Sequence, residues 1–396
     1  MRKILIALFV FMSCFTTKAF TDGHAIKMGI ILGFTGPIES LTPAMRDSAK
    51  LAFEEASKSG SLLGGKTIKV LEGDSTCTDT AAAVSAAEGL VSNGVVAIMG
   101  ADCSGVTGAI ATNVAVPNGV VMISPSATSP GLTDLKDNGY FFRTAPSDAR
   151  GGQILADITR DRKIKSLAIT YTNNDYGKGL ADVYAAAVKA HGIKVTTVAA
   201  HEDGKADYSA EVATLASAGG DAVAVIGYLD QGGKGIIQGS LDSGAFDTFI
   251  LSDGMIGDSL TDAFGKSLNK SFGSLPGSTG KGAGVFAKVA GKAGIDPSGP
   301  YTGESYDAAA LIVLAIQAGG SADRGSIAKN VMAVANGPGK KIYPGQLKKA
   351  LDLLAKGKAV DYEGATGVVF TDVGEHVGNF LEKEIKGGKF KTKKQR

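Results

Sequence analysis

Short apolar runs rich in β-branched residues alternate with alanine-rich stretches along most of the chain. Continuous apolar strands alternate with helices in this way where a parallel sheet is covered on both faces. The pattern therefore predicts a doubly wound α/β unit from about residue 25 to residue 143. Its strands are expected at 26–33, 66–74, 95–100 and 119–125, with helices at 43–60, 78–94 and from Ser104.

The same pattern restarts after residue 143. Strands are expected at 166–172, 194–200, 222–228 and 248–253, and helices at 176–192, 208–218 and 231–243. A chain of 396 residues is too long for one ordinary hydrophobic core. We therefore expect two successive α/β units of similar size, at 25–143 and 144–275.

A glycine-rich segment, 273–284, follows the second unit. Gly280 and Lys281 resemble part of a phosphate-binding loop, but Gly282 stands where that motif needs Ser or Thr, and no strand is expected before it. The segment is therefore interpreted as a linker. Three further helices are expected at 284–294, 303–318 and 346–356, and two strands at 367–370 and 376–385.

These late helices must cover a sheet that is already built, most economically the first one. The chain would then cross between the lobes three times, and several parallel crossovers make a hinge rather than a loose tether. The crossings are expected near 143–146, 274–277 and 361–366. The expected lobes are 25–143 plus 277–360, and 144–276 plus 361–396.

The N-terminus has the pattern of a secretory signal peptide. Two basic residues precede the apolar run 4–15, and a small-x-small site ends at Ala19, where cleavage is expected. The run is short for a membrane anchor. Lipidation of Cys14 is a lower-ranked alternative, because the residues before it make a poor lipidation signal. We expect residues 1–19 to be removed and the protein to reach the periplasm.

The charge balance argues against nucleic acid as a partner. Loss of residues 1–19 leaves 38 basic side chains against 39 acidic ones. This near-neutral balance gives no indication of nucleic-acid binding. The basic tail, 386–396, is interpreted as a solvated and frayed terminus.

Two cysteines, Cys77 and Cys103, remain after cleavage. An even pair in an exported protein is normally a disulfide. The four histidines are scattered, and the sequence has neither HExxH nor CxxC, so metal binding and thiol catalysis are disfavoured. We expect a Cys77–Cys103 disulfide and no cofactor.

Polar side chains follow several of the predicted strands, and ligands of open α/β sheets bind at these carboxyl ends. In the first unit, Ser104 at a helix start, Ser126 and Thr128 offer hydroxyl and amide donors for a carboxylate. In the second unit, Asp253 suits an ammonium group, with Tyr176 and Tyr228 as hydrogen-bonding walls. Together these groups suit a zwitterionic α-amino acid.

Each of these residues also has an ordinary structural explanation. Ser104 could be a helix N-cap, and the loop around Ser126 could be simple turn chemistry. Tyr176 could pack on its strand, and Asp253 could belong to a turn. An exported hydrolase is disfavoured, because no GxSxG motif occurs and the polar cluster has no general base beside a nucleophile. Only the joint placement at strand ends in both units favours a binding site.

Seven motifs are spread along the mature chain: IKMGIILGFTGP, GDSTCTD, GADCSG, MISPSATSP, NNDYGKGLA, LSDG and DPSGPYTGESYDAA. With them the sequence resembles the leucine/isoleucine/valine-binding proteins, which are amino-acid receptors of ABC importers with the type I periplasmic-binding fold. The resemblance implies that Ser104, Thr128 and the main chain at Ser126 bind the ligand carboxylate. It also implies that Asp253 replaces a glutamate of the relatives, with an arm one methylene shorter.

The resemblance further implies a side-chain pocket near Leu41, Asp102 and Tyr301. Relatives with aliphatic ligands tend to have an apolar residue at the position of Asp102. A buried carboxylate without a partner is costly, so we expect Asp102 to face solvent or to meet a polar or cationic ligand group. The expected ligand is a branched-chain, polar or cationic amino acid. The expected partner of the monomer is an inner-membrane ABC permease, and the alternative role is a soluble sensing partner of a receptor.

Overall fold

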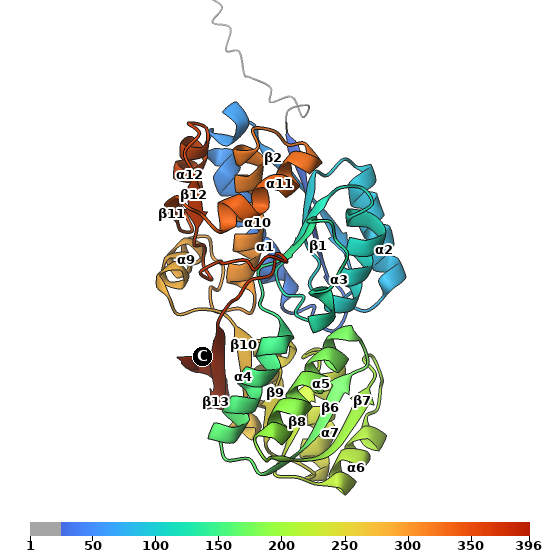
Figure 1. The fold of residues 1–396 in the computed structure, drawn as a ribbon. Helices are drawn as coiled ribbons and strands as arrows, with labels where there is room; N and C mark the ends of the chain where they lie inside the picture. The colour runs from blue at the N-terminus through green and yellow to red at the C-terminus, as the bar shows by residue number, and fades with distance from the viewer. Residues whose placement is uncertain (1–24) are drawn as a thin grey trace, which may run out of the picture.

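The computed structural model describes residues 25–396, which form two lobes, each built around its own sheet (Figure 1). The first sheet is wholly parallel, in the order β2-β1-β3-β4-β5. The two-lobed α/β architecture predicted from the pattern is confirmed. The five strands are β1 (Ile26–Leu32), β2 (Ile68–Asp74), β3 (Ala97–Gly100), β4 (Val121–Ser124) and β5 (Phe141–Arg143).

The first sheet is covered by helices from both ends of the chain. Its N-terminal helices are α1 (Thr42–Lys58), α2 (Thr80–Ser92) and α3 (Ser104–Ile110). Late helices complete the cover, as expected: α9 (Lys281–Lys292), α10 (Thr302–Ala318), α11 (Arg324–Ala335) and α12 (Leu347–Leu354), with the small parallel pair β11 (Lys340–Ile342) and β12 (Val360–Tyr362). Helix α10 packs along α1 and is buried on nearly all sides, which explains its lack of a polar face.

The second sheet has the order β14-β13-β10-β9-β8-β6-β7. Strands β6 (Ser166–Thr172), β7 (Lys194–His201), β8 (Ala222–Ile226), β9 (Phe249–Leu251) and β10 (Phe272–Pro276) are parallel, and β13 (Phe380–Lys386) and β14 (Lys389–Gln395) add two antiparallel strands. The helices of this lobe are α4 (Asp148–Asp161), α5 (Asp175–Ala190), α6 (Ser209–Ala218), α7 (Gly232–Ser243) and α8 (Asp258–Phe264).

The interpretation of 273–284 as a linker is wrong, because this segment contains most of β10 and the start of α9. Gly273 is required by close packing: a Cβ there would overlap the carbonyl oxygen of Leu251 in the neighbouring strand. The strand expected at 367–370 is also wrong, since only Phe370 forms an isolated bridge. Helix α11 was not predicted, although the Asp323 side chain caps it by accepting from Ser326 N.

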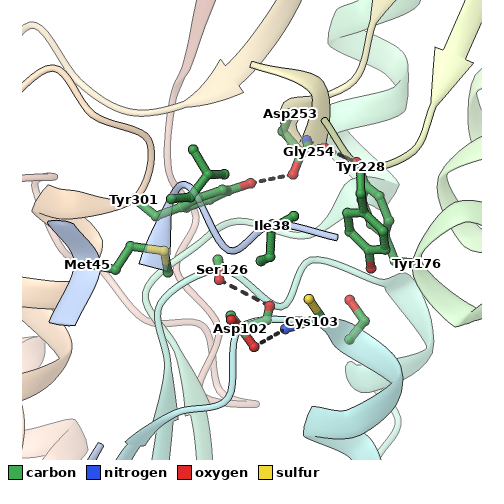
Figure 2. Close-up of a pocket in the computed structure, with 12 residues that line it drawn as sticks. Ile38, Met45, Asp102, Cys103, Ser126, Tyr176, Tyr228, Asp253, Gly254 and Tyr301 are labelled. Carbon is green, nitrogen blue, oxygen red and sulfur yellow. Dashed lines mark hydrogen bonds between the residues drawn. The ribbon is translucent and has the colours of Figure 1, made fainter. Parts of the chain in front are cut away.

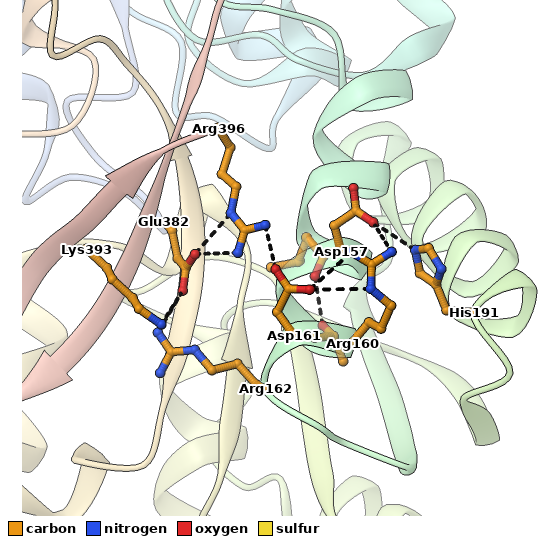
Figure 3. Close-up of polar contacts among 10 residues, drawn as sticks. Asp157, Arg160, Asp161, Arg162, His191, Glu382, Lys393 and Arg396 are labelled. Atoms are coloured by element: carbon orange, nitrogen blue, oxygen red, sulfur yellow. Dashed lines mark hydrogen bonds and ion pairs between the residues drawn. The ribbon is translucent and has the colours of Figure 1, made fainter.

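The C-terminal tail is ordered, which corrects the expectation of a frayed terminus. The main chain of Arg396 forms two hydrogen bonds with Phe380, of 2.7 and 3.2 Å. Its guanidinium pairs with the buried carboxylate of Glu382 at 2.5 Å and with Asp161 at 2.7 Å (Figure 3). Arg162 and Lys393 also contact Glu382, so two basic residues of the tail, Lys393 and Arg396, share this acidic partner.

Three segments join the lobes. Two of them, 144–147 and 277–280, lie near the expected crossings. Residues 363–376 still contact the first lobe: Asp307 of α10 accepts hydrogen bonds from Ala365 and Thr366, and Phe370 stacks on Phe142 of β5. We therefore propose that the third crossing lies at 377–379 rather than at 361–366, with residues 361–376 in the first lobe.

Within residues 25–396, every helix is too short or too polar to span a bilayer. The predicted signal peptide 1–19, its cleavage site and Cys14 lie outside the described residues.

Candidate ligand-binding site

A cavity with about 350 Å³ of space not filled by atoms lies between the lobes (Figure 2). Both lobes contribute to its wall, and eight of the nine residues predicted for the ligand and its pocket line it; Thr128 does not. The full lining is Ile38, Leu41, Met45, Asp102, Cys103, Ser104, Ser126, Tyr176, Tyr228, Asp253, Gly254 and Tyr301.

Asp253 follows β9 in the second lobe and is 7% exposed. One carboxylate oxygen lies 2.7 Å from the Tyr176 hydroxyl, and the other accepts a hydrogen bond from Tyr301. Burial raises the pKa of the Asp253 carboxyl, and the two tyrosine hydrogen bonds oppose this shift. A cationic group in the cavity would therefore be stabilised by Asp253.

Tyr176 and Tyr228 form one wall of the cavity. Their rings stack with centroids 5.2 Å apart and an interplanar angle of 20°. Helix α5 can begin at the end of β6 because Asn174 caps it, accepting from Gly177 N at 3.0 Å. A Cβ at Gly177 would overlap the carbonyl oxygen of Thr172, so the glycine permits this close approach. The NNDYG sequence thus positions the Tyr176 ring.

Ser104 and Ser126 face the cavity from the first lobe. Ser104 is not the N-cap of α3, because Cys103 occupies that position. Its hydroxyl oxygen accepts from Ser129 N at 3.0 Å, which leaves the hydroxyl proton available to a ligand. The Ser126 hydroxyl donates to the carbonyl of Asp102 at 3.1 Å.

Buried Arg143 braces the loop that carries these hydroxyls. Its guanidinium donates to the carbonyls of Ala127 and Ser129, at 3.1 and 2.8 Å, and pairs with Glu375 at 2.5 Å. Sequence reasoning missed this residue, because an arginine ending an unpredicted strand carries no local signal. Arg143 explains how a Ser/Thr/Pro loop keeps a fixed shape beside the cavity.

Thr128 and Asp148 form a second group near the cavity. The Thr128 hydroxyl is fully buried beside the Asp148 carboxyl group, and the Thr128 carbonyl accepts from Asp148 N at 2.8 Å. Asp148 begins α4 and is 3% exposed. Burial and the neighbouring Asp253 raise the pKa of Asp148 well above its usual range.

Asp148 was missed for a physical reason. In the sequence it follows Ser147, which caps α4, so it has the pattern of an ordinary acidic residue in a first helical turn. Only the fold brings its charge close enough to raise the pKa of Tyr176 and Tyr301. Asp148 is therefore a second buried carboxyl group near Asp253 that was not predicted, although it does not line the cavity.

Neither expected alternative describes Asp102. Its carboxylate accepts from Gly33 N at 2.6 Å, from the Ser75 hydroxyl at 3.0 Å and from Cys103 N at 2.9 Å. Three protein donors satisfy this buried charge, so it needs neither solvent nor a ligand. The adjacent Cys77–Cys103 disulfide, predicted from the cysteine pair, is confirmed. Asp102 thus gives no reason to exclude an apolar ligand side chain.

The remaining wall is apolar. Ile38, Leu41 and Met45 come from the loop after β1 and the first turn of α1. The second lobe packs closely against them, since a Cβ at Gly257 would lie 3.0 Å from a methyl carbon of Leu41. This end of the cavity can hold an aliphatic group and exclude water.

Hydrogen bonds at the cavity mouth join the lobes directly. Asp230 N donates to the Pro37 carbonyl at 3.1 Å, and Ser40 N donates to the Asp230 carboxylate at 3.0 Å. On the other side, the Ser129 hydroxyl donates to the Asp175 carbonyl at 3.0 Å. The lobes are therefore closed over the cavity.

Known proteins share this architecture. A sequence model described as periplasmic binding protein matches residues 25–376. The Leu/Ile/Val-binding protein BraC3 of Rhizobium johnstonii is 30% identical over 81% of this chain and 86% of the relative. The chemotactic signal transduction system substrate-binding protein BasB of Halobacterium salinarum is 28% identical over 94% and 89%. The solved leucine-binding protein LivK of Thermotoga maritima superposes with a TM-score of 0.78 at 21% identity, over 94% and 98%.

Proposed function

Because the chain belongs to the periplasmic binding protein family, we propose that it binds an aliphatic α-amino acid in the cavity between its lobes. The resemblance to leucine/isoleucine/valine-binding proteins is confirmed by the relatives, and the family consists of substrate-binding proteins rather than enzymes.

The position of Asp253 carries this proposal. It is a buried acid at the cavity wall, held by Tyr176 and Tyr301, and the Ser104 and Ser126 hydroxyls line the same cavity from the other lobe. An ammonium group on Asp253, and a carboxylate that accepts from the Ser104 hydroxyl and the main-chain N–H of Ser126, would satisfy both sets of groups. Buried charges are stable when paired and hydrogen-bonded in this way.

Asp148 and Thr128 strengthen the cationic end of the proposed site. Asp148 lies close enough to Asp253 for the two acids to interact, and Arg143 offsets part of the negative charge of Asp148. Thr128 does not line the cavity, so we assign it an indirect role, in which its hydroxyl holds the Asp148 carboxyl group.

The apolar wall supports an aliphatic side chain. Ile38, Leu41 and Met45 offer no hydrogen bond to a polar substituent, and Asp102 is occupied by protein donors. A polar or cationic side chain would therefore lose its hydration without compensation. Leucine, isoleucine and valine are the ligands that fit best.

Ligand binding would act through hinge closure, for which periplasmic binding proteins are a standard example. Only a ligand that contacts both lobes can shift the balance between open and closed forms. The closed monomer would then deliver its ligand to an ABC permease in the inner membrane. Removal of residues 1–19 would release it into the periplasm.

A sensing role is the second candidate. The relative BasB bears a name that places it in a chemotactic system. A partner of that kind would recognise the same closed form. Growth of a deletion strain on leucine as sole nitrogen source tests transport, and a swimming assay towards leucine tests sensing.

The ligand is tested by thermal unfolding of the mature chain with each of the common amino acids. Leucine, isoleucine or valine should raise the melting temperature by mass action, whereas N-acetyl-leucine and leucinamide should not. Stabilisation by the blocked compounds, or by sugars alone, would contradict the proposal.

A further inference from the structure

A second cavity lies beside the hinge, apart from the ligand cavity. It contains about 730 Å³ of space not filled by atoms and is lined by residues of α9, α10, β10, β13 and β14. In Figure 1, α9 lies near β10 and β13 where the two lobes meet. Of the described residues, Tyr301 alone lines both cavities. The two are therefore neighbours with separate polar groups.

Glu304 lines the hinge cavity from the first turn of α10 and is 4% exposed. Its carbonyl accepts from the Thr144 hydroxyl at 2.9 Å. Its carboxylate receives no hydrogen bond from any other residue in the part of the chain that the structure describes. Burial, reinforced by nearby Asp307, raises the pKa of Glu304 to about 8. The carboxylate is thus poorly compensated in the absence of a ligand.

Lys383 lines the same cavity from β13 in the second lobe and is 8% exposed. Its ammonium donates to the Thr392 hydroxyl at 3.0 Å, and within residues 25–396 no carboxylate lies within 4.0 Å of it. Asp296 and Glu304 attract it at longer range, while burial lowers its pKa. A second buried charge therefore faces the cavity with only one neutral partner.

We propose that the hinge cavity binds a second small zwitterion, with its ammonium group on Glu304 and its acid group on Lys383. A simple cation would leave Lys383 uncompensated, and a simple anion would leave the buried Glu304 carboxyl group without a partner. A molecule with both charges satisfies both side chains at once. The hydroxyls of Thr302 and Thr366 lie on the same wall; both donate within the protein, to Gly299 and Asp307, so each can accept a further hydrogen bond from the ligand ammonium.

This site would affect the hinge. Glu304 belongs to α10 of the first lobe, and Lys383 belongs to β13 of the second. A ligand that bridges them favours one angle between the lobes, and therefore changes the affinity of the cleft between them. The coupling is reciprocal, so occupancy of the cleft changes affinity at the hinge by the same factor.

The test uses the full mature chain carrying Asp253→Ala, which disables the proposed cleft site. Threonine methyl groups are labelled with carbon-13, and the spectra are followed during titration with glycine, alanine and leucine. We expect at least one of these zwitterions to shift the Thr302 and Thr392 methyl signals. Sodium acetate and ammonium chloride should produce no such shift.

Substitutions then assign the contacts. Glu304→Gln and Lys383→Met should each lower the affinity for the zwitterion at least about tenfold, the usual effect of losing a charged partner. Lys386→Met, on the same strand but with an exposed side chain, is the matched control and should change nothing. If Glu304→Gln does not fold, Lys383→Met alone decides.

Three outcomes would overturn the proposal. These are the absence of methyl shifts with all three zwitterions at millimolar concentration, equal shifts with acetate or ammonium alone, and unchanged affinity in the variants that fold. Each of these results is independent of whether leucine binds the cleft of the unmodified chain.

Discussion

Tyr301 donates a hydrogen bond to Asp253 across the boundary between the two lobes. Tyr301 precedes α10 in the first lobe and has a left-handed backbone with φ of 59°, whereas Asp253 follows β9 in the second. A non-glycine residue in this conformation stores strain and persists only where its surroundings fix it. The acid proposed to bind the ligand ammonium is thus also a contact that holds the lobes together.

Tyr301→Phe removes this donor while keeping the ring. We expect leucine affinity to fall about tenfold, because hydrogen bonds to charged groups contribute roughly 1.5–3 kcal/mol. Isothermal titration calorimetry measures the change, and Tyr140→Phe, away from the cavity, is the control. Unchanged affinity would show that Tyr301 does not stabilise the liganded form.

Asp230→Ala opens the contact at the cavity mouth. Asp230 accepts from Ser40 N of the first lobe and from the Ser259 hydroxyl at 2.6 Å. Asp230 does not line the cavity. Its loss should therefore lower the affinity for leucine several-fold, and solely by destabilising the closed form. Small-angle scattering should show a more open average shape at subsaturating leucine. The control is Asp262→Ala on the exposed face of α8; an equal effect there would refute this explanation.

Asp102→Leu tests whether the buried aspartate is structural. The substitution leaves the donors of Gly33, Ser75 and Cys103 without their acceptor, at about 1–3 kcal/mol for each buried group left unpaired. We expect a marked loss of unfolding free energy by urea denaturation, and a smaller loss for Asp102→Asn. The order of preference among leucine, isoleucine and valine should stay the same. A switch of preference to polar ligands would indicate that Asp102 contacts the ligand side chain.

Glu304 makes stability depend on pH. Its pKa is about 8 in the folded chain against an ordinary value of 4.5. Between these values the folded chain binds more protons than the unfolded chain, so stability falls as pH rises. The wild type should therefore lose stability relative to Glu304→Gln between pH 5 and pH 8, in amino-acid-free buffer. Asp307 and Lys383, the charged groups facing Glu304, are common to both proteins, and parallel stability curves would contradict the expectation.

The sequence pattern located strands β1–β4 and β6–β9 and most of the cavity lining. In a parallel sheet the carboxyl ends of the strands meet at one edge, so residues after strands, such as Ser104 and Asp253, converge. Asp148 escaped notice because its role depends on α4 meeting Thr128 from the other lobe. Asp102 was misjudged because Gly33 and Ser75, distant in sequence, satisfy its charge.

The ends of the second sheet show the same limit. Gly273 made β10 look like a linker, although the glycine is required by the neighbouring strand. The lysine-rich sequence of the tail is typical of a frayed terminus. The fold nevertheless brings Glu382 and Asp161 beside Arg396, and these ion pairs hold the tail. Local pattern carries information about a segment, but not about the partner that the fold brings to it.

Calorimetric titration of leucine into the wild type and Asp253→Asn tests the proposed ammonium contact most directly. The substitution keeps the size of the side chain and removes its charge. We expect at least about a hundredfold loss of affinity, because a buried ammonium group would lose its charged partner. Asp253→Glu, which restores the charge, should recover part of it. Equal leucine affinity in the wild type and Asp253→Asn, with both proteins folded, would contradict the proposal that Asp253 binds the ligand ammonium.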